Sequence, residues 1–128
     1  MRSIAIGLLL AAVTAAFFAV LPDDRARGAA ANLLTLIAAI YVGFALASNG
    51  KLNLPRQVAG CAVFVALALA GLWFSWWFLV AGLALHGLWD YLHHGEHGHG
   101  VVPRWYVPFC AWYDWAVAAF LAVRYALP

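Results

Sequence analysis

Long uncharged stretches are the feature that most constrains this chain. Residues 3–21 contain no charged side chain, and residues 57–94 run for 38 positions without a lysine or arginine. Over the whole chain, 67% of residues are hydrophobic and 9% are charged, whereas soluble domains carry roughly 25% charged residues. So few charges cannot cover the surface of a soluble globule, and the sequence therefore predicts an integral membrane protein.

The apolar stretches divide into segments of membrane-spanning length, because a helix needs about 20 residues to cross a hydrocarbon core about 30 Å thick. Polar stretches at 22–28 and 49–56, a tryptophan-rich break at 71–77 and a loop at 95–108 separate them. We predict one all-α transmembrane domain, residues 1–128, with five spans at about 3–21, 29–48, 57–72, 75–94 and 109–125. A four-span bundle is the alternative, with the first segment cleaved as a signal peptide or the third and fourth fused.

The distribution of basic residues predicts an orientation in the cell membrane. Five spans place Arg2, Lys51, Arg56 and Arg104 on one side and the other three arginines on the opposite side. The first side, which holds the histidine-rich loop, thus carries one basic residue more than the other. The positive-inside rule therefore makes the first side cytoplasmic. The basic residues are scattered along the chain and the net charge is only +2, so we do not expect a nucleic-acid partner. The expected partner is the lipid bilayer.

All five histidines lie in the stretch LALHGLWDYLHHGEHGHG, residues 83–100. His86, Asp90 and His93 are spaced i, i+4 and i+7, which places them on one face of a helix, and His94 lies beside that face. An ionisable residue inside a span costs from about 2.5 kcal/mol upward and usually marks a function. This helix face is therefore the first place to expect chemistry.

A second polar group comes from the last span. Asp114 lies within it, and the short preceding loop makes spans four and five antiparallel neighbours, so Asp114 is expected to face His86. We predict a shared pocket of His86, Asp90, His93 and Asp114, with His94 beside it. Imidazole and carboxylate are ligands of divalent transition metals, here zinc or iron.

Two further residues are candidates for moving protons at this pocket, Glu96 and Tyr113, and Cys110 is a possible extra member. Structural alternatives stay open. Asp114 could pair with Arg104 instead, and the loop histidines could bind metal only adventitiously. A row of small residues on the second span, Ala39, Gly43 and Ala47, predicts close helix packing rather than chemistry.

Two motifs, HGLWDYLHH at 86–94 and CAWYD at 110–114, resemble a family of small bacterial integral membrane proteins of unknown function. The resemblance covers most of the chain and implies a multi-span membrane protein without implying an activity. Membrane fatty-acid desaturases and nickel or cobalt permeases are similar only locally, since this chain has one histidine motif and lacks the desaturases' other boxes.

Three functions remain open from the sequence. The first is a metal-dependent enzyme acting on a lipid-like or isoprenoid-like substrate. The second is a small metal or proton transporter, which would need a homo-oligomer to line a path. The third is an accessory subunit of a larger membrane complex that binds a pigment or haem, with His86 as axial ligand. The residues favour a metal site over the subunit role but do not rank enzyme against transporter.

Overall fold

The computed structural model describes residues 1–94 and 101–127, and in these residues it contains helices and no strand. The five helices are α1 Arg2–Val20, α2 Asp23–Ala47, α3 Leu54–Trp73, α4 Trp77–Leu92 and α5 Tyr106–Ala126. The prediction of an all-α helical bundle is confirmed. The break between the third and fourth helices falls after Trp73, inside the stretch where the tryptophans predicted it.

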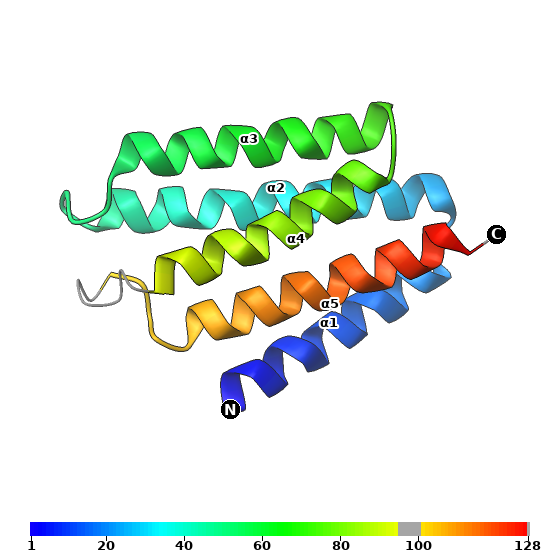
Figure 1. Ribbon diagram of the computed structural model, residues 1–128, viewed down its shortest axis with the longest axis horizontal. Helices are drawn as coiled ribbons and strands as arrows, with labels where there is room; N and C mark the ends of the chain where they lie inside the picture. Colours follow the sequence, from blue (N-terminus) through cyan, green and yellow to red (C-terminus); the bar gives the residue numbers. More distant parts are fainter. Residues whose placement is uncertain (95–100, 128) are drawn as a thin grey trace.

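The helices form an up-and-down bundle in which α4 crosses the middle (Figure 1). Helix α4 contacts α2, α3 and α5, while α3 packs on α2. Helix α1 packs mainly against α5 and only slightly against its chain neighbour α2. The N-terminus, the α2–α3 loop and the α4–α5 connection lie at one end, and the C-terminus lies at the other. The membrane side on which each end lies stays a prediction.

Four helices, α1, α2, α3 and α5, are long and apolar enough to cross a membrane. Helix α4 has 16 residues, about 24 Å of helix, which is shorter than a hydrocarbon core of about 30 Å. Its flanking turns extend it at both ends, and it lies in the bundle between α3 and α5 (Figure 1). The five-span arrangement, with α4 as a short central span, therefore stays a prediction.

Three helices begin earlier than the sequence predicted. Helix α2 starts at Asp23 instead of residue 29, because Pro22 caps it and acidic residues fill its first turn, where they interact favourably with the helix dipole. Helix α3 starts at Leu54, where the Asn53 side chain accepts a hydrogen bond from the Arg56 backbone N–H at 2.9 Å. Helix α5 starts at Tyr106 instead of residue 109. Pro108 then lies in the first turn of the helix, where a proline is tolerated.

Small residues allow close helix approach, but not where the row on α2 predicted it. A Cβ at Gly7 of α1 would overlap the Phe109 carbonyl of α5, and one at Gly60 of α3 would lie 2.8 Å from the Trp89 ring of α4. By contrast, Gly43 faces outward, with no atom within 4 Å of a Cβ placed there. The predicted close helix packing at this row does not occur within the chain, because other residues of α2, including Leu34, form its buried face.

The topology predicts opposite exposure of two loops. In a protein with both cysteines replaced by alanine, Lys51→Cys and Pro22→Cys should react with a membrane-impermeant maleimide from opposite sides. In intact cells only Pro22→Cys should label, and both should label after permeabilisation. Labelling of both positions in intact cells would contradict the five-span topology, and labelling of Lys51→Cys alone would reverse the orientation.

Candidate metal centre

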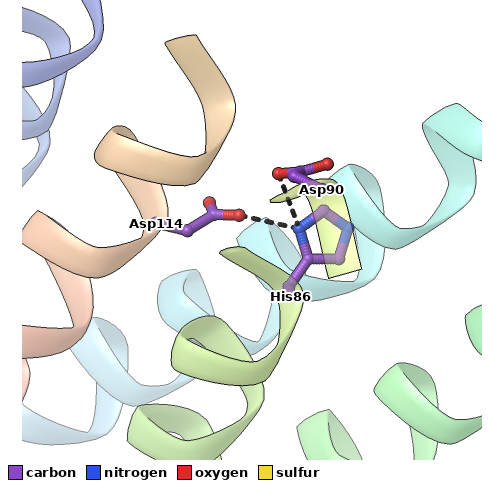
Figure 2. A group of neighbouring side chains, drawn as sticks. All are labelled: His86, Asp90 and Asp114. Atoms are coloured by element: carbon purple, nitrogen blue, oxygen red, sulfur yellow. Dashed lines mark hydrogen bonds and ion pairs between the residues drawn. The ribbon is translucent and has the colours of Figure 1, made fainter. Parts of the chain in front are cut away.

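The centre of the bundle contains one histidine and two aspartates (Figure 2). His86 and Asp90 come from α4 and Asp114 comes from α5, and all three side chains are buried. His86 Nδ1 lies 2.7 Å from Asp114 Oδ2 and 3.6 Å from Asp90 Oδ2. One ligand atom from each residue lies within 4.8 Å of the others. These three residues form the metal-ligand group found in the described part of the chain, and we call them the triad.

The spacing of residues on α4 and a glycine at the α4–α5 contact assemble the triad. His86 and Asp90 are one turn apart, so both side chains project from the same helix face. Gly87 allows α5 to approach, since a Cβ there would lie 2.6 Å from Trp115 Nε1 and 3.1 Å from the Ala111 carbonyl oxygen. Trp115 Nε1 donates a 3.1 Å hydrogen bond to the α4 backbone at Ala84, which fixes this close contact. Asp114 is thereby brought to His86.

Most polar atoms of the triad lack partners. His86 Nδ1 is hydrogen-bonded to Asp114 Oδ2, but both Asp90 oxygens, Asp114 Oδ1 and His86 Nε2 have no hydrogen-bond partner among the described residues. A buried polar atom without a partner costs about 1–3 kcal/mol, and more when it is charged. Two neighbouring carboxylates in a low-dielectric interior also cannot both remain ionised without a compensating cation. The triad therefore requires bound protons or a cation.

A divalent cation fits this arrangement. Nitrogen and carboxylate-oxygen ligands bind zinc at about 2.0–2.2 Å, which places tetrahedral ligand atoms about 3.3–3.6 Å apart. The separation of 3.6 Å between His86 and Asp90 already matches, and the 2.7 Å hydrogen bond to Asp114 would open when its proton leaves.

The surroundings of the triad are polar toward one end and apolar toward the other. The polar side chains Tyr41, Gln57, His93, Tyr106 and Cys110 are buried on the side of the α4–α5 connection. The opposite side is filled by Leu34, Leu79, Leu83, Val117 and Leu121, all fully buried. Leu83 and Val117 lie three residues from His86 and Asp114 along their helices, and Leu79 and Leu121 lie seven residues from them, all away from the α4–α5 connection. Leu34 of α2 belongs to the same buried cluster. We call these five residues the apolar layer.

His93 and His94 do not join the triad. His93 lies two turns beyond His86, about 10 Å along the helix, which is too far to share one ion with it. Its Nδ1 donates to the Trp89 carbonyl at 2.8 Å, and its Nε2 lies 3.0 Å from Gln57 Nε2. His94 is exposed, with its ring stacked near Tyr91 at 6.5 Å. The expected four-residue pocket thus contains three of its members.

The two candidate proton carriers are placed differently. Tyr113 points away from the triad toward α1, where its hydroxyl lies 3.0 Å from Thr14 Oγ1. Glu96 lies outside the described residues, as do the other two loop histidines, His97 and His99. Cys110 is a buried free thiol one turn before Asp114 and is not part of the ligand group.

The sequence reasoning did not single out Gln57 or Phe64. Gln57 is buried against His93, and the signal that could have identified it is an amide at the edge of an apolar span. The Phe64 ring lies 4.9 Å from the His86 ring in an edge-to-face contact. No pattern distinguishes Phe64 from the other aromatic residues of the chain.

Comparison with known proteins identifies a family. The profile of a family of unknown function, DUF6010, matches residues 2–126. The chain belongs to this family. The resemblance to a family without an established activity is thereby confirmed. No curated protein and no solved structure matches the chain, so any function for this DUF6010 protein has to be argued from the triad itself.

The close approach at Gly87 gives a stability prediction. Gly87→Ala should lower the thermal unfolding temperature in detergent, because the new methyl group overlaps Trp115 and overpacking typically costs about 1–3 kcal/mol. Gly43→Ala is the matched control, a glycine on α2 with open space around it. It should leave the unfolding temperature unchanged or raise it, because alanine favours a helix by about 1 kcal/mol. Equal effects of the two substitutions would show that the contact at Gly87 does not limit packing.

Proposed function

We propose that this protein is an integral membrane protein that binds a divalent transition metal ion, zinc or iron, through His86, Asp90 and Asp114. The observation that carries the proposal is the burial of two carboxylates beside one imidazole, with several of their polar atoms unpartnered. A doubly charged cation neutralises two ionised aspartates while the imidazole stays neutral. The assembled site then has no net charge, which the low-dielectric interior favours.

We further propose that the metal serves a membrane enzyme. Three protein ligands leave a coordination position free, which is the pattern of catalytic rather than structural zinc sites. A divalent ion held there supplies Lewis acidity and an activated water. The triad residues would orient that ion, and the surrounding helices would exclude bulk water from it.

A lipid-like substrate suits the position of the triad. His86 lies nine residues from the start of α4, about 14 Å along the helix, so the site is at hydrocarbon depth. A lipid is already present at that depth, whereas a water-soluble substrate would have to be desolvated to reach it. The apolar layer supports an enzyme over a transporter, because it closes the interior between the triad and the C-terminal end of the bundle.

Metal content tests the site. In a background in which His94, His97 and His99 are replaced by glutamine, the purified protein should contain about one zinc or iron ion per chain. His86→Ala, Asp90→Asn and Asp114→Asn should each lose that ion, because each removes one of three ligands. Elemental analysis by mass spectrometry measures the content. The matched control, His93→Gln on the same helix, should retain the metal.

Two outcomes would contradict the metal site. One is a metal-free protein that also fails to bind added zinc or ferrous ion after purification in chelator. The other is loss of metal from His93→Gln but not from the triad variants. Because Asp90→Asn and Asp114→Asn preserve side-chain shape, a thermal unfolding curve for each variant separates loss of a ligand from loss of the fold.

Ion flux tests the choice between enzyme and transporter. Proteoliposomes containing an internal zinc-sensitive dye should show the same zinc entry for the wild-type protein and for Asp114→Asn, because the apolar layer blocks a path across the bundle. Zinc entry that requires the wild-type triad would replace the enzyme proposal with the transporter alternative.

A further inference from the structure

A lateral groove opens between α1 and α2, on a part of the surface that is separate from the triad. The groove has a volume of about 390 Å³, at the lower end of the range of about 300–1,000 Å³ for ligand pockets. Its walls include Phe17 of α1 and Leu33 and Leu36 of α2, and Tyr113 of α5 lies at its floor. It exists because α1 packs on α5 and barely touches α2. In a bilayer, the groove faces lipid chains.

The floor of the groove offers hydrogen-bond acceptors. The Thr14 hydroxyl donates its proton to the Leu10 carbonyl at 3.0 Å, so the 3.0 Å contact between Thr14 and Tyr113 has the Tyr113 hydroxyl as donor. Each hydroxyl has a single proton, and both protons are therefore engaged inside the protein. The oxygen of Tyr113 keeps free lone pairs. A ligand at this floor would have to supply a donor.

The wall of the groove offers a donor. Asn32 of α2 lines the groove, is exposed, and has no side-chain partner among the described residues. It lies nine residues into α2, about 14 Å along the helix axis. At such a depth hydrocarbon provides no hydrogen bonds, and an unpartnered amide is costly. The amide N–H group would therefore be stabilised by a ligand that accepts a hydrogen bond.

The position of the groove favours a lipid chain as its occupant. The groove lies between α1 and α2, two helices that are long and apolar enough to cross a membrane. Hydrocarbon chains are therefore abundant at the groove mouth. A hydroxyl group is the simplest group that both donates to the Tyr113 oxygen and accepts from the Asn32 amide, whereas a ketone accepts only.

We propose that the groove between α1 and α2 binds one hydrocarbon chain of a membrane lipid, and that Tyr113 and Asn32 select a chain carrying a hydroxyl group along its length. The juxtaposition of an acceptor floor, a donor wall and apolar sides carries this inference. It is independent of the triad, since none of the three triad residues lines the groove.

Photo-crosslinking tests the groove with defined probes. The purified protein is labelled with a fatty acid carrying a diazirine in mid-chain, and peptide mass spectrometry locates the label, which should fall on the groove-lining residues of α1 and α2. As competitor, 12-hydroxyoctadecanoate should be about fivefold more effective than octadecanoate, the effect of roughly one net hydrogen bond. The labelling should be the same in protein treated with chelator and in zinc-loaded protein, so its outcome is separate from that of the metal site.

Two variants and one matched control sharpen the test. Ala29→Phe narrows the groove and should reduce labelling at least severalfold. Ala39→Phe places the same side chain on an exposed position of α2 outside the groove lining, and should label like the wild type. Asn32→Leu should keep the labelling but lose the preference for the hydroxylated competitor, which a purely structural asparagine would not affect. Thermal unfolding checks the fold of each variant.

Three results would overturn the proposal. The first is label distributed outside the groove. The second is equal competition by the hydroxylated and plain fatty acids in the wild-type protein. The third is a covalent crosslink between two copies of the protein through α2 that is lost in Asn32→Leu. This result would mean that a second copy of the protein, and not a lipid, contacts this asparagine.

Discussion

The burial of two aspartates beside one histidine, between two helices in apolar surroundings, is the constraint on which the interior of this protein depends. The hydrogen bond from His86 to Asp114 joins α4 to α5, and Gly87 lets those helices come close enough to form it. Desolvation of charged groups costs several kcal/mol for each ion. The interior is therefore stable only when protons or a cation balance the carboxylates, and this requirement links the packing of α4 on α5 to what the protein binds.

The bundle separates three environments. Polar side chains are buried between the triad and the end with the α4–α5 connection, while the apolar layer closes the opposite side. At the far end of the bundle Arg124 binds Asp23 at 2.8 Å and the backbone of the α1–α2 turn, which ties the last helix to the first two. The groove between α1 and α2 remains open to lipid because α1 packs on α5. Access to the triad and access to the groove are thus separate features of the fold.

Much of this arrangement could be predicted from the sequence, because hydrophobic length specifies spans and the i, i+4 spacing specifies a helix face. His86, Asp90 and Asp114 were predicted to lie together on that basis. The exclusion of His93 was also within reach of the sequence, because seven residues of helix are about 10 Å long, but the shared helix face alone suggested that it would join the others. The outward direction of Gly43 was also missed, since small residues look alike in sequence whether they face a helix or lipid. The earlier starts of α2 and α5 depend on caps and first-turn chemistry that hydropathy ignores.

X-ray absorption at the zinc edge of the zinc-loaded protein tests the central claim most directly. The account predicts a shell of nitrogen and oxygen ligands only, at about 2.0–2.2 Å, with the outer-shell scattering of a single imidazole. A sulfur ligand at about 2.3 Å, which would come from Cys110 or Cys61, would contradict it. The scattering of two or more imidazoles would also contradict it, because the metal would then be held by the other histidines instead of by His86, Asp90 and Asp114.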